Sequence, residues 1–167
     1  MVGEGEIHPA RASIRAGGRA SYDRNGKISN KERGVGMNEF TVKTTQHTQF
    51  IEITELIQQA VDEGGIKDGV CIAFVPHTTC GITINENADP DVAADMIYAL
   101  EQAVPWKSPH YRHGEGNTAA HVKSSMVGHS VNFLVKDGRL QFGTWQGVFL
   151  CEFDGPRSRK VWVKLIG

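Results

Sequence analysis

The sequence predicts a mainly β fold with flanking helices, an α+β domain built as an antiparallel sandwich or barrel. Three observations lead to this fold class. Segments that read as short strands outnumber those that read as helices, and the last third of the chain is almost entirely strand and turn. Moreover, no glycine-rich phosphate loop or dinucleotide fingerprint follows a strand, so the pattern does not suggest a doubly wound parallel sheet.

The strands are predicted from alternating or continuous apolar segments bounded by turn residues. The segment 69–75 is almost continuously apolar, which predicts a strand covered on both faces. The Asp137-Gly138 pair predicts a hairpin turn. The strands expected from these patterns lie near residues 40–44, 50–53, 69–75, 81–85, 130–135, 140–142, 146–153 and 160–166.

Capping residues delimit the expected helices. Thr54 is a good N-cap for a short helix that runs to about Glu63 and ends at Gly64-Gly65. A second helix is capped by Asp89, begins with Pro90, and carries apolar residues at helical spacing until Pro105. Residues 106–118 are loop-like, and one or two helical turns are expected at 118–127.

Composition separates residues 1–36 from the folded domain predicted at 37–167. The first segment has seven basic and four acidic residues and almost no large apolar side chains, which predicts a disordered or vector-derived extension. A formal net charge of -1 for the whole chain gives no bias toward nucleic acid or an anionic membrane. Three cysteines without a CxxC pair, no apolar span and no signal peptide predict a cytoplasmic protein.

Three histidines are the candidate metal ligands. His77 follows the apolar strand, whereas His121 and His129 flank the expected third helix. Three neutral imidazoles and a water would suit zinc or a similar divalent ion, although each histidine taken alone is more often structural. Cys80, three residues after His77, offers a Cys–His nucleophile as a weaker alternative.

Other polar residues are candidates for catalysis. Glu86 is not needed to cap a helix and is interpreted as a general base or as a partner that orients a histidine. Two glycines surround Trp145, which suggests a bulge that aims it into a cleft, with a packed corner as the alternative. Arg157 follows a tight Asp-Gly-Pro turn and, with Arg159 and Lys160, forms a cationic patch suited to phosphate or carboxylate, or else a solvated basic turn.

From about Met37 to Gly167 the chain resembles the YjbQ family, whose members are described as secondary thiamine-phosphate synthase enzymes. The resemblance implies a β-sandwich with flanking helices, assembled as a homotrimer with a divalent-metal site, zinc or magnesium, near subunit boundaries. Its site residues would be His77, His121 and His129 for the metal, with Glu86, Asn117, Trp145 and Arg157 around them. The stretch around His129 departs from the pattern expected of the family. The motifs that carry the resemblance are HTTCG at 77–81, NENADP at 85–90, NTAAHVKSS at 117–125, GTWQG at 143–147 and DGPR at 154–157.

The activity that the resemblance implies joins a pyrimidine diphosphate to a thiazole phosphate and releases pyrophosphate. We expect this to be a side activity on a small phosphorylated substrate, with another physiological reaction. The alternative is a non-catalytic trimer that binds a small molecule or a metal. A nucleic-acid partner reached through the basic residues of segment 1–36 is disfavoured, because three excess charges give little support.

Overall fold

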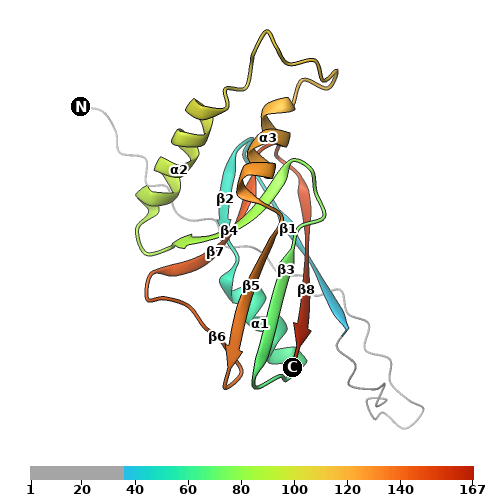
Figure 1. The fold of residues 1–167 in the computed structure, drawn as a ribbon, viewed down its shortest axis with the longest axis vertical. Coiled ribbons are helices and arrows are strands. Elements are labelled where there is room, and N and C mark those ends of the chain that lie inside the picture. The colour runs from blue at the N-terminus through green and yellow to red at the C-terminus, as the bar shows by residue number, and fades with distance from the viewer. Residues whose placement is uncertain (1–35) are drawn as a thin grey trace.

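Two antiparallel β-sheets and three helices make up the protein, as a computed structural model describes it for residues 36–167 (Figure 1). The predicted extension 1–36 therefore lies outside the described residues, except for Gly36. All the strand pairs are antiparallel, which confirms the predicted fold class. The elements are β1 (Met37–Lys43), β2 (Gln49–Glu52), α1 (Thr54–Gly64), β3 (Gly69–Phe74), β4 (Cys80–Glu86), α2 (Pro90–Ala103), α3 (Thr118–Val127), β5 (Ser130–Lys136), β6 (Arg139–Leu140), β7 (Gln146–Glu152) and β8 (Ser158–Ile166).

The two sheets differ in size and enclose the main core. The larger sheet has the strand order β1-β8-β3-β5-β6, and the smaller has the order β2-β7-β4. Inward side chains of both sheets and of α1 pack together between them, among them Ile57, Cys71, Leu150 and Val161. This arrangement is a sandwich rather than a barrel, because the two sheets share no strand pairing.

The expectation that residues 69–75 are covered on both faces is wrong. Cys71 and Ala73 are fully buried, but Phe74 points to the other face of the sheet and is 38% exposed. Leu134 and Ile166 are exposed as well. Only one face of the larger sheet packs on the smaller sheet, and residues 36–167 form no second layer over these apolar side chains.

One of the three expected helices, α1, begins differently in detail. Residue Ile53, not Thr54, occupies the N-cap of α1, and the Thr54 hydroxyl accepts a hydrogen bond from the Val148 backbone N–H at 2.9 Å. Thr54 therefore ties α1 to β7 instead of capping the helix. At α2 the prediction is confirmed, since the Asp89 side chain accepts from the Asp91 N–H at 2.9 Å.

Helix α2 is attached loosely to the rest of the chain. None of its residues is buried, although Leu100 packs in part against the smaller core cluster of Ala120, Phe149, Cys151 and Phe153 (Figure 1). Its firmest polar attachment is Glu101, whose carboxylate accepts from the Thr48 hydroxyl at 2.9 Å and pairs with the buried Lys123 ammonium at 2.7 Å. These polar contacts of Glu101, and the packing of Leu100 against the smaller core cluster, fix the end of α2 from which the loop 106–116 departs.

Membrane insertion was not expected from the sequence. Among residues 36–167, none of the helices combines the length and the apolar character needed to cross a bilayer.

Candidate functional site

The start of α3 and the turn that follows β7 meet at one end of the sandwich. Asn117, the N-cap residue of α3, donates from its side-chain amide to Asp154 at 3.2 Å and to Glu115 at 3.4 Å. Asp154 in turn accepts from the Arg157 guanidinium at 2.6 Å. Asn117 and Arg157, 40 residues apart in the sequence, therefore belong to one contact cluster.

Two buried oxygen atoms in this cluster have no hydrogen-bond partner among the described residues. They are the side-chain carbonyl oxygen of Asn117 and the hydroxyl of Thr118. Asn117 is only 6% exposed, so its free acceptor is costly unless a ligand or water satisfies it. A ligand group that donates a hydrogen bond would satisfy either atom.

Histidine side chains lie beside this cluster. The rings of His113 and His121 meet edge to face with centroids 5.2 Å apart, and His113 lies 3.9 Å from the Glu115 carboxylate. The cluster thus runs from His121 through His113, Glu115 and Asn117 to the turn. We call His113, Asn117, His121, Asp154 and Arg157, with Glu115 between them, the polar cluster.

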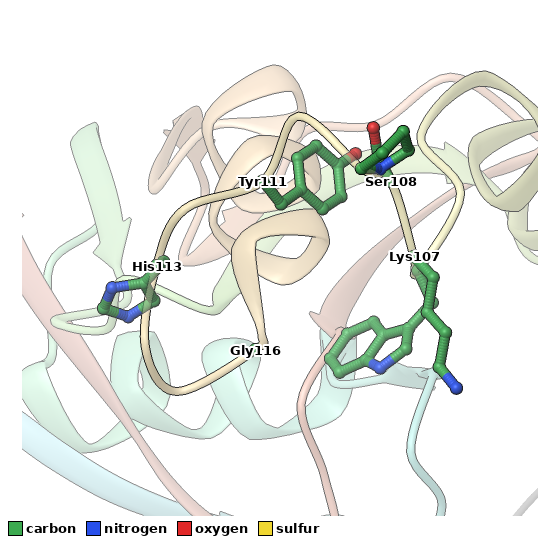
Figure 2. A pocket seen from close by; sticks show the side chains of 7 residues that line it. Lys107, Ser108, Tyr111, His113 and Gly116 are labelled. Atoms are coloured by element: carbon green, nitrogen blue, oxygen red, sulfur yellow. The ribbon is translucent and has the colours of Figure 1, made fainter.

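A cavity of about 470 Å³ lies along the loop that leads to the polar cluster. Figure 2 shows His113 at one end of this loop and Lys107 at the other, with Ser108 and Tyr111 between them. Indole, phenol, hydroxyl, imidazole and ammonium groups around one opening suit a small ligand with both apolar and anionic parts. The lining residues are Trp106, Lys107, Ser108, Pro109, Tyr111, His113 and Gly116.

A buried ion pair between Glu152 and Arg159 lies next to the polar cluster and supports it. Glu152 is fully buried and Arg159 is 5% exposed, and the guanidinium Nε donates to the Glu152 carboxylate at 2.7 Å. A second guanidinium N–H donates to the Thr79 hydroxyl at 2.8 Å. Arg159 was expected, with Arg157 and Lys160, to form a cationic patch for phosphate or carboxylate, or else a solvated basic turn; instead its guanidinium is buried against Glu152. Glu152 was not among the candidates, and its signal in the sequence is a lone carboxylate within the apolar run 148–153.

Glu152 also shapes the turn that presents Arg157. One of its carboxylate oxygens accepts the backbone N–H groups of Phe153 at 3.0 Å and Asp154 at 2.9 Å. The other accepts from the Thr44 hydroxyl at 3.0 Å, and the same hydroxyl accepts from the Arg157 backbone N–H at 2.8 Å. The position of the turn that carries Arg157 is therefore fixed by the buried Glu152 carboxylate as well as by the turn's own sequence.

Asp154 is held in its ionised form by this environment. Partial burial raises the pKa of Asp154, but hydrogen bonds from Arg157 and Asn117 outweigh burial and hold the pKa below its usual 3.8. At neutral pH Asp154 therefore stays an acceptor that orients both side chains.

His77 lies next to the buried pair rather than in the polar cluster. Its Nε2 atom accepts the Lys160 backbone N–H at 2.7 Å, which places the ring proton on Nδ1. Burial lowers the pKa of His77, and the positive charge of Arg159 lowers it further. In this arrangement neither ring nitrogen has a free lone pair for a metal.

We expect NMR to find His77 neutral, with its proton on Nδ1 and a titration midpoint below the ordinary 6.5. Because the unfolded chain takes up this proton more readily, the His77 contribution to stability is present above pH 6.5 and is lost as the pH falls below it. Long-range proton–nitrogen spectra measure tautomer and midpoint together, with the exposed His110 as the reference ring. A proton on Nε2, or a midpoint above 6.5, would contradict the geometry.

The three-histidine metal centre is not assembled within one chain. Among residues 36–167, no three His, Cys, Asp or Glu side chains lie close enough together to hold a metal ion. His129 immediately precedes β5, and its backbone carbonyl accepts from the Val75 N–H at 2.9 Å. Zinc or magnesium binding by His77, His121 and His129 therefore stays a prediction.

Glu86 and Trp145 lie at the opposite end of the smaller sheet from the polar cluster. Along the β4–β7 ladder Cys80 pairs with Glu152, and Glu86 pairs with Gln146 six residues later. Six residues of strand span about 20 Å, so neither side chain reaches the polar cluster within one chain. Trp145 is 63% exposed, so it neither packs in a corner nor enters a cleft of its own chain.

The Cys80 thiol is not a nucleophile. Burial, with a smaller contribution from the nearby Glu152 carboxylate, raises the pKa of Cys80 to about 12. All three cysteines are buried and free, so the Cys–His alternative is wrong.

The fold and the site define a small antiparallel β-sandwich with three helices and a polar cluster beneath a loop at one end. This chain belongs to the YjbQ family: residues 38–167 match the family described as UPF0047 protein YjbQ-like. It is 51% identical to the UPF0047 protein YugU of Bacillus subtilis over 126 residues, covering 75% of this chain and 96% of YugU. It is 49% identical over 128 residues to the UPF0047 protein MJ1081 of Methanocaldococcus jannaschii, covering 77% and 92% of the two chains.

Solved structures of similar proteins share the fold. An uncharacterised YjbQ/UPF0047 protein from Clostridium acetobutylicum superposes with a TM-score of 0.75 at 52% identity, covering 77% of this chain and 98% of that one. A protein of unknown function from Sulfolobus solfataricus gives the same TM-score of 0.75 at 32% identity, covering 80% and 97%. The sandwich is therefore retained as the sequence diverges.

Proposed function

We propose that the protein binds a small phosphorylated substrate at the polar cluster and the adjoining cavity. The observation that carries this proposal is the placement of Arg157 beside the start of α3. The Arg157 side chain is 51% exposed, and Asp154 holds it through its carboxylate at 2.6 Å and its backbone carbonyl at 2.7 Å. A guanidinium fixed in this way keeps further N–H donors for a phosphate, and the positive end of the helix dipole adds to the attraction.

The reaction we propose is the condensation associated with the family, in which a pyrimidine diphosphate joins a thiazole phosphate and pyrophosphate leaves. Arg157 and Lys107 would stabilise the negative charge of the leaving pyrophosphate. The free Asn117 oxygen would accept from a hydroxyl or amino group of the substrate. His113 and His121, the two imidazoles of the polar cluster, would transfer protons to and from the substrate.

A divalent metal has no step in this proposal, because the three histidines do not form a ligand set within one chain. Assembly of several copies, as the homotrimer of the family resemblance, is part of the proposal. It is supported by α2, none of whose residues is buried in the single chain.

Non-catalytic binding is the second candidate function. It is favoured by the distance of Glu86 and Trp145 from the polar cluster, since these two candidate catalytic residues are separated from Asn117 and Arg157 by the length of β4. Ligand binding without turnover is the result that it predicts.

Arg157→Ala is expected to weaken pyrophosphate binding by about 10-fold or more, because a hydrogen bond to a charged group contributes about 1.5–3 kcal/mol. Titration calorimetry with pyrophosphate and with inorganic phosphate measures the loss. Arg157→Lys should recover only part of the affinity, because an ammonium lacks the guanidinium fork. Arg139→Ala in the β5–β6 hairpin is the matched control, and equal losses in both variants would contradict the assignment.

The catalytic part of the proposal has a separate test. Purified protein is incubated with the pyrimidine diphosphate and the thiazole phosphate, and pyrophosphate release is compared between the wild type and His121→Ala. Release that depends on His121 supports the enzyme. Substrate binding without any release supports the non-catalytic alternative.

A further inference from the structure

The outer face of the larger sheet carries two adjacent aromatic side chains that point away from the core. Trp162 on β8 lies opposite Phe74 on β3, and their ring centroids are 5.8 Å apart with an angle of 31° between the ring planes. Phe74 is 38% exposed, and Trp162 is partly exposed. Because residues 36–167 form no second layer over this face, both rings can be reached from solvent.

Glu39 on β1 holds the tryptophan in place. The Trp162 indole N–H donates to one Glu39 carboxylate oxygen at 2.8 Å, and the Lys160 ammonium pairs with the other oxygen at 2.9 Å. The indole is therefore bounded by Glu39 on one side and by Phe74 on the other. An aromatic side chain that is already oriented loses little conformational entropy when another ring stacks on it.

The same face is basic. Buried and exposed residues alternate along each strand of the larger sheet, which identifies the side chains that point outward. Glu39 is the one outward carboxylate on these strands. The formal net charge of -1 for the whole chain therefore conceals a face with an excess of positive charge. The outward cations are Lys43, Lys136, Arg139, Lys160 and Lys164.

Two exposed acidic residues offset this charge at one end of the face. Asp137 is in the turn between Lys136 and Arg139, and Asp68 comes directly before β3, which pairs with β5. The positive charge of that hairpin is therefore largely balanced. The other three cations are lysines on β1 and β8, the strands that carry Glu39 and the indole. The uncompensated charge thus lies around the aromatic pair.

Basic and aromatic side chains alternate along β8. Lys160, Trp162 and Lys164 occupy every second position on the outer face, so their Cα atoms follow one another at about 7 Å. Lys43 on β1 lies opposite Ser158, two positions before Lys160. From Ser158 to Lys164 this line is about 20 Å long. Positive charge is therefore present on both sides of the aromatic pair.

The chemistry of this face selects its partner. Segment 1–36 has more basic than acidic residues, so its charge does not complement a basic face. An anionic bilayer fits poorly, because it would take the Glu39–Lys160 ion pair and the polar side chains of Ser130 and Asn132 into an apolar interface. A single-stranded nucleic acid has phosphates for the lysines, bases that stack on aromatic rings, and base edges that form hydrogen bonds with hydroxyl and amide groups.

We propose that the outer face of the larger sheet binds single-stranded nucleic acid. A base stacks on the Phe74–Trp162 pair, and phosphates on either side of it pair with Lys43, Lys160 and Lys164. A duplex does not fit this arrangement, because its bases are already stacked on one another and offer no free face to the rings. The site shares no residue with the polar cluster and does not depend on the proposed function.

Substitutions at Phe74 test the stacking. The probes are fluorescein-labelled oligothymidylate and oligouridylate of about 12 nucleotides, within the usual footprint of one binding domain. Fluorescence anisotropy at low salt should show binding by the wild type. Phe74→Leu, which keeps an apolar side chain but removes the aromatic ring, should weaken it about 10-fold or more, whereas Phe74→Tyr should retain it.

Leu134→Ala is the matched control for the aromatic position. It removes another exposed apolar side chain from the same face, at the end away from the aromatic pair, and should bind the probes as the wild type does. Thermal unfolding checks that each variant is folded. No binding by the wild type, full binding by Phe74→Leu, or an equal loss in Leu134→Ala would overturn the proposal.

The salt dependence of binding tests the lysines. Three phosphate contacts to a single strand predict a slope of about −2 for the logarithm of the binding constant against that of the salt concentration. Lys164→Gln should reduce the steepness of this slope by about 0.7, because it removes one contact. Lys67→Gln, at an exposed lysine in the loop before β3, should leave the slope unchanged. Equal effects of the two substitutions would contradict the assignment.

Competitors distinguish nucleic acid from other partners. Duplex DNA of the same length and polyglutamate should each compete about 10-fold less well than the single strand, because neither offers a base for stacking. Equal competition by polyglutamate would show that the face recognises charge alone. Sedimentation should give Phe74→Leu the mass of the wild type, and a smaller mass would assign the face to a contact between copies. Either of these results would overturn the proposal.

Discussion

Glu152→Ala is expected to lower the melting temperature by roughly 10–20 °C, the largest effect we predict for a single side chain. The substitution leaves the Arg159 guanidinium buried at 5% exposure without its carboxylate. Breaking a buried pair by removing one partner costs about 3–5 kcal/mol. It also removes the acceptor for the Phe153, Asp154 and Thr44 donors. Thermal unfolding followed by circular dichroism measures the change.

The double variant Glu152→Ala, Arg159→Met separates the unpaired charge from the lost hydrogen bonds. It should recover a large part of the stability, because an apolar replacement of a buried pair is often close to neutral. Pyrophosphate binding should not recover with it, since the turn that carries Arg157 still lacks its buried acceptor. A single variant as stable as the wild type would show that the pair does not hold the fold.

Gly155→Ala is expected to lower the melting temperature by about 5–15 °C, because overpacking a rigid position typically costs about 1–3 kcal/mol and sometimes more. A Cβ atom at this position would lie 2.2 Å from the Gln46 backbone carbonyl and 2.9 Å from both Glu152 Cγ and Thr44 Oγ1. The chain cannot retreat easily, since the Gly155 N–H donates to the His47 carbonyl at 2.9 Å. The turn must therefore move, and pyrophosphate affinity should fall with it.

Gly114→Ala is the matched control for this prediction. A Cβ atom there would have no heavy atom within 4 Å, and the residue also belongs to a loop next to the polar cluster. Its melting temperature should stay close to that of the wild type. Equal destabilisation of the two variants would attribute the effect to loss of glycine's flexibility rather than to the close contacts of Gly155.

Local signals in the sequence were sufficient to predict most of the fold. The cap at Asp89, the glycines after α1 and the Asp137-Gly138 hairpin all occur where expected, since each depends on backbone preferences of one or two residues. The coverage of 69–75 was predicted wrongly, because an apolar run shows only that side chains avoid water. An apolar run does not show whether the residues that bury it belong to the same chain.

The candidate site was harder to predict because it depends on long-range pairing. Asn117 and Arg157 were identified as candidates, but their shared partner Asp154 was interpreted only as a turn residue. Glu152 was missed, because the strand pattern does not identify its partner Arg159, which lies seven residues later on β8. His77 was predicted to be a metal ligand, whereas its Nε2 atom accepts the Lys160 backbone N–H.

The pairing of β1 with β8 has a consequence for how this domain is extended. Met37 lies opposite Lys164, so the first described strand enters the sandwich beside the place where the last one leaves it. Both lie away from the loop 106–116 (Figure 1). Sequence added before β1 is therefore joined far from the polar cluster. This fits the match to YugU, which covers 96% of that protein but only 75% of this chain. Residues joined before β1 are therefore expected to leave the polar cluster unchanged.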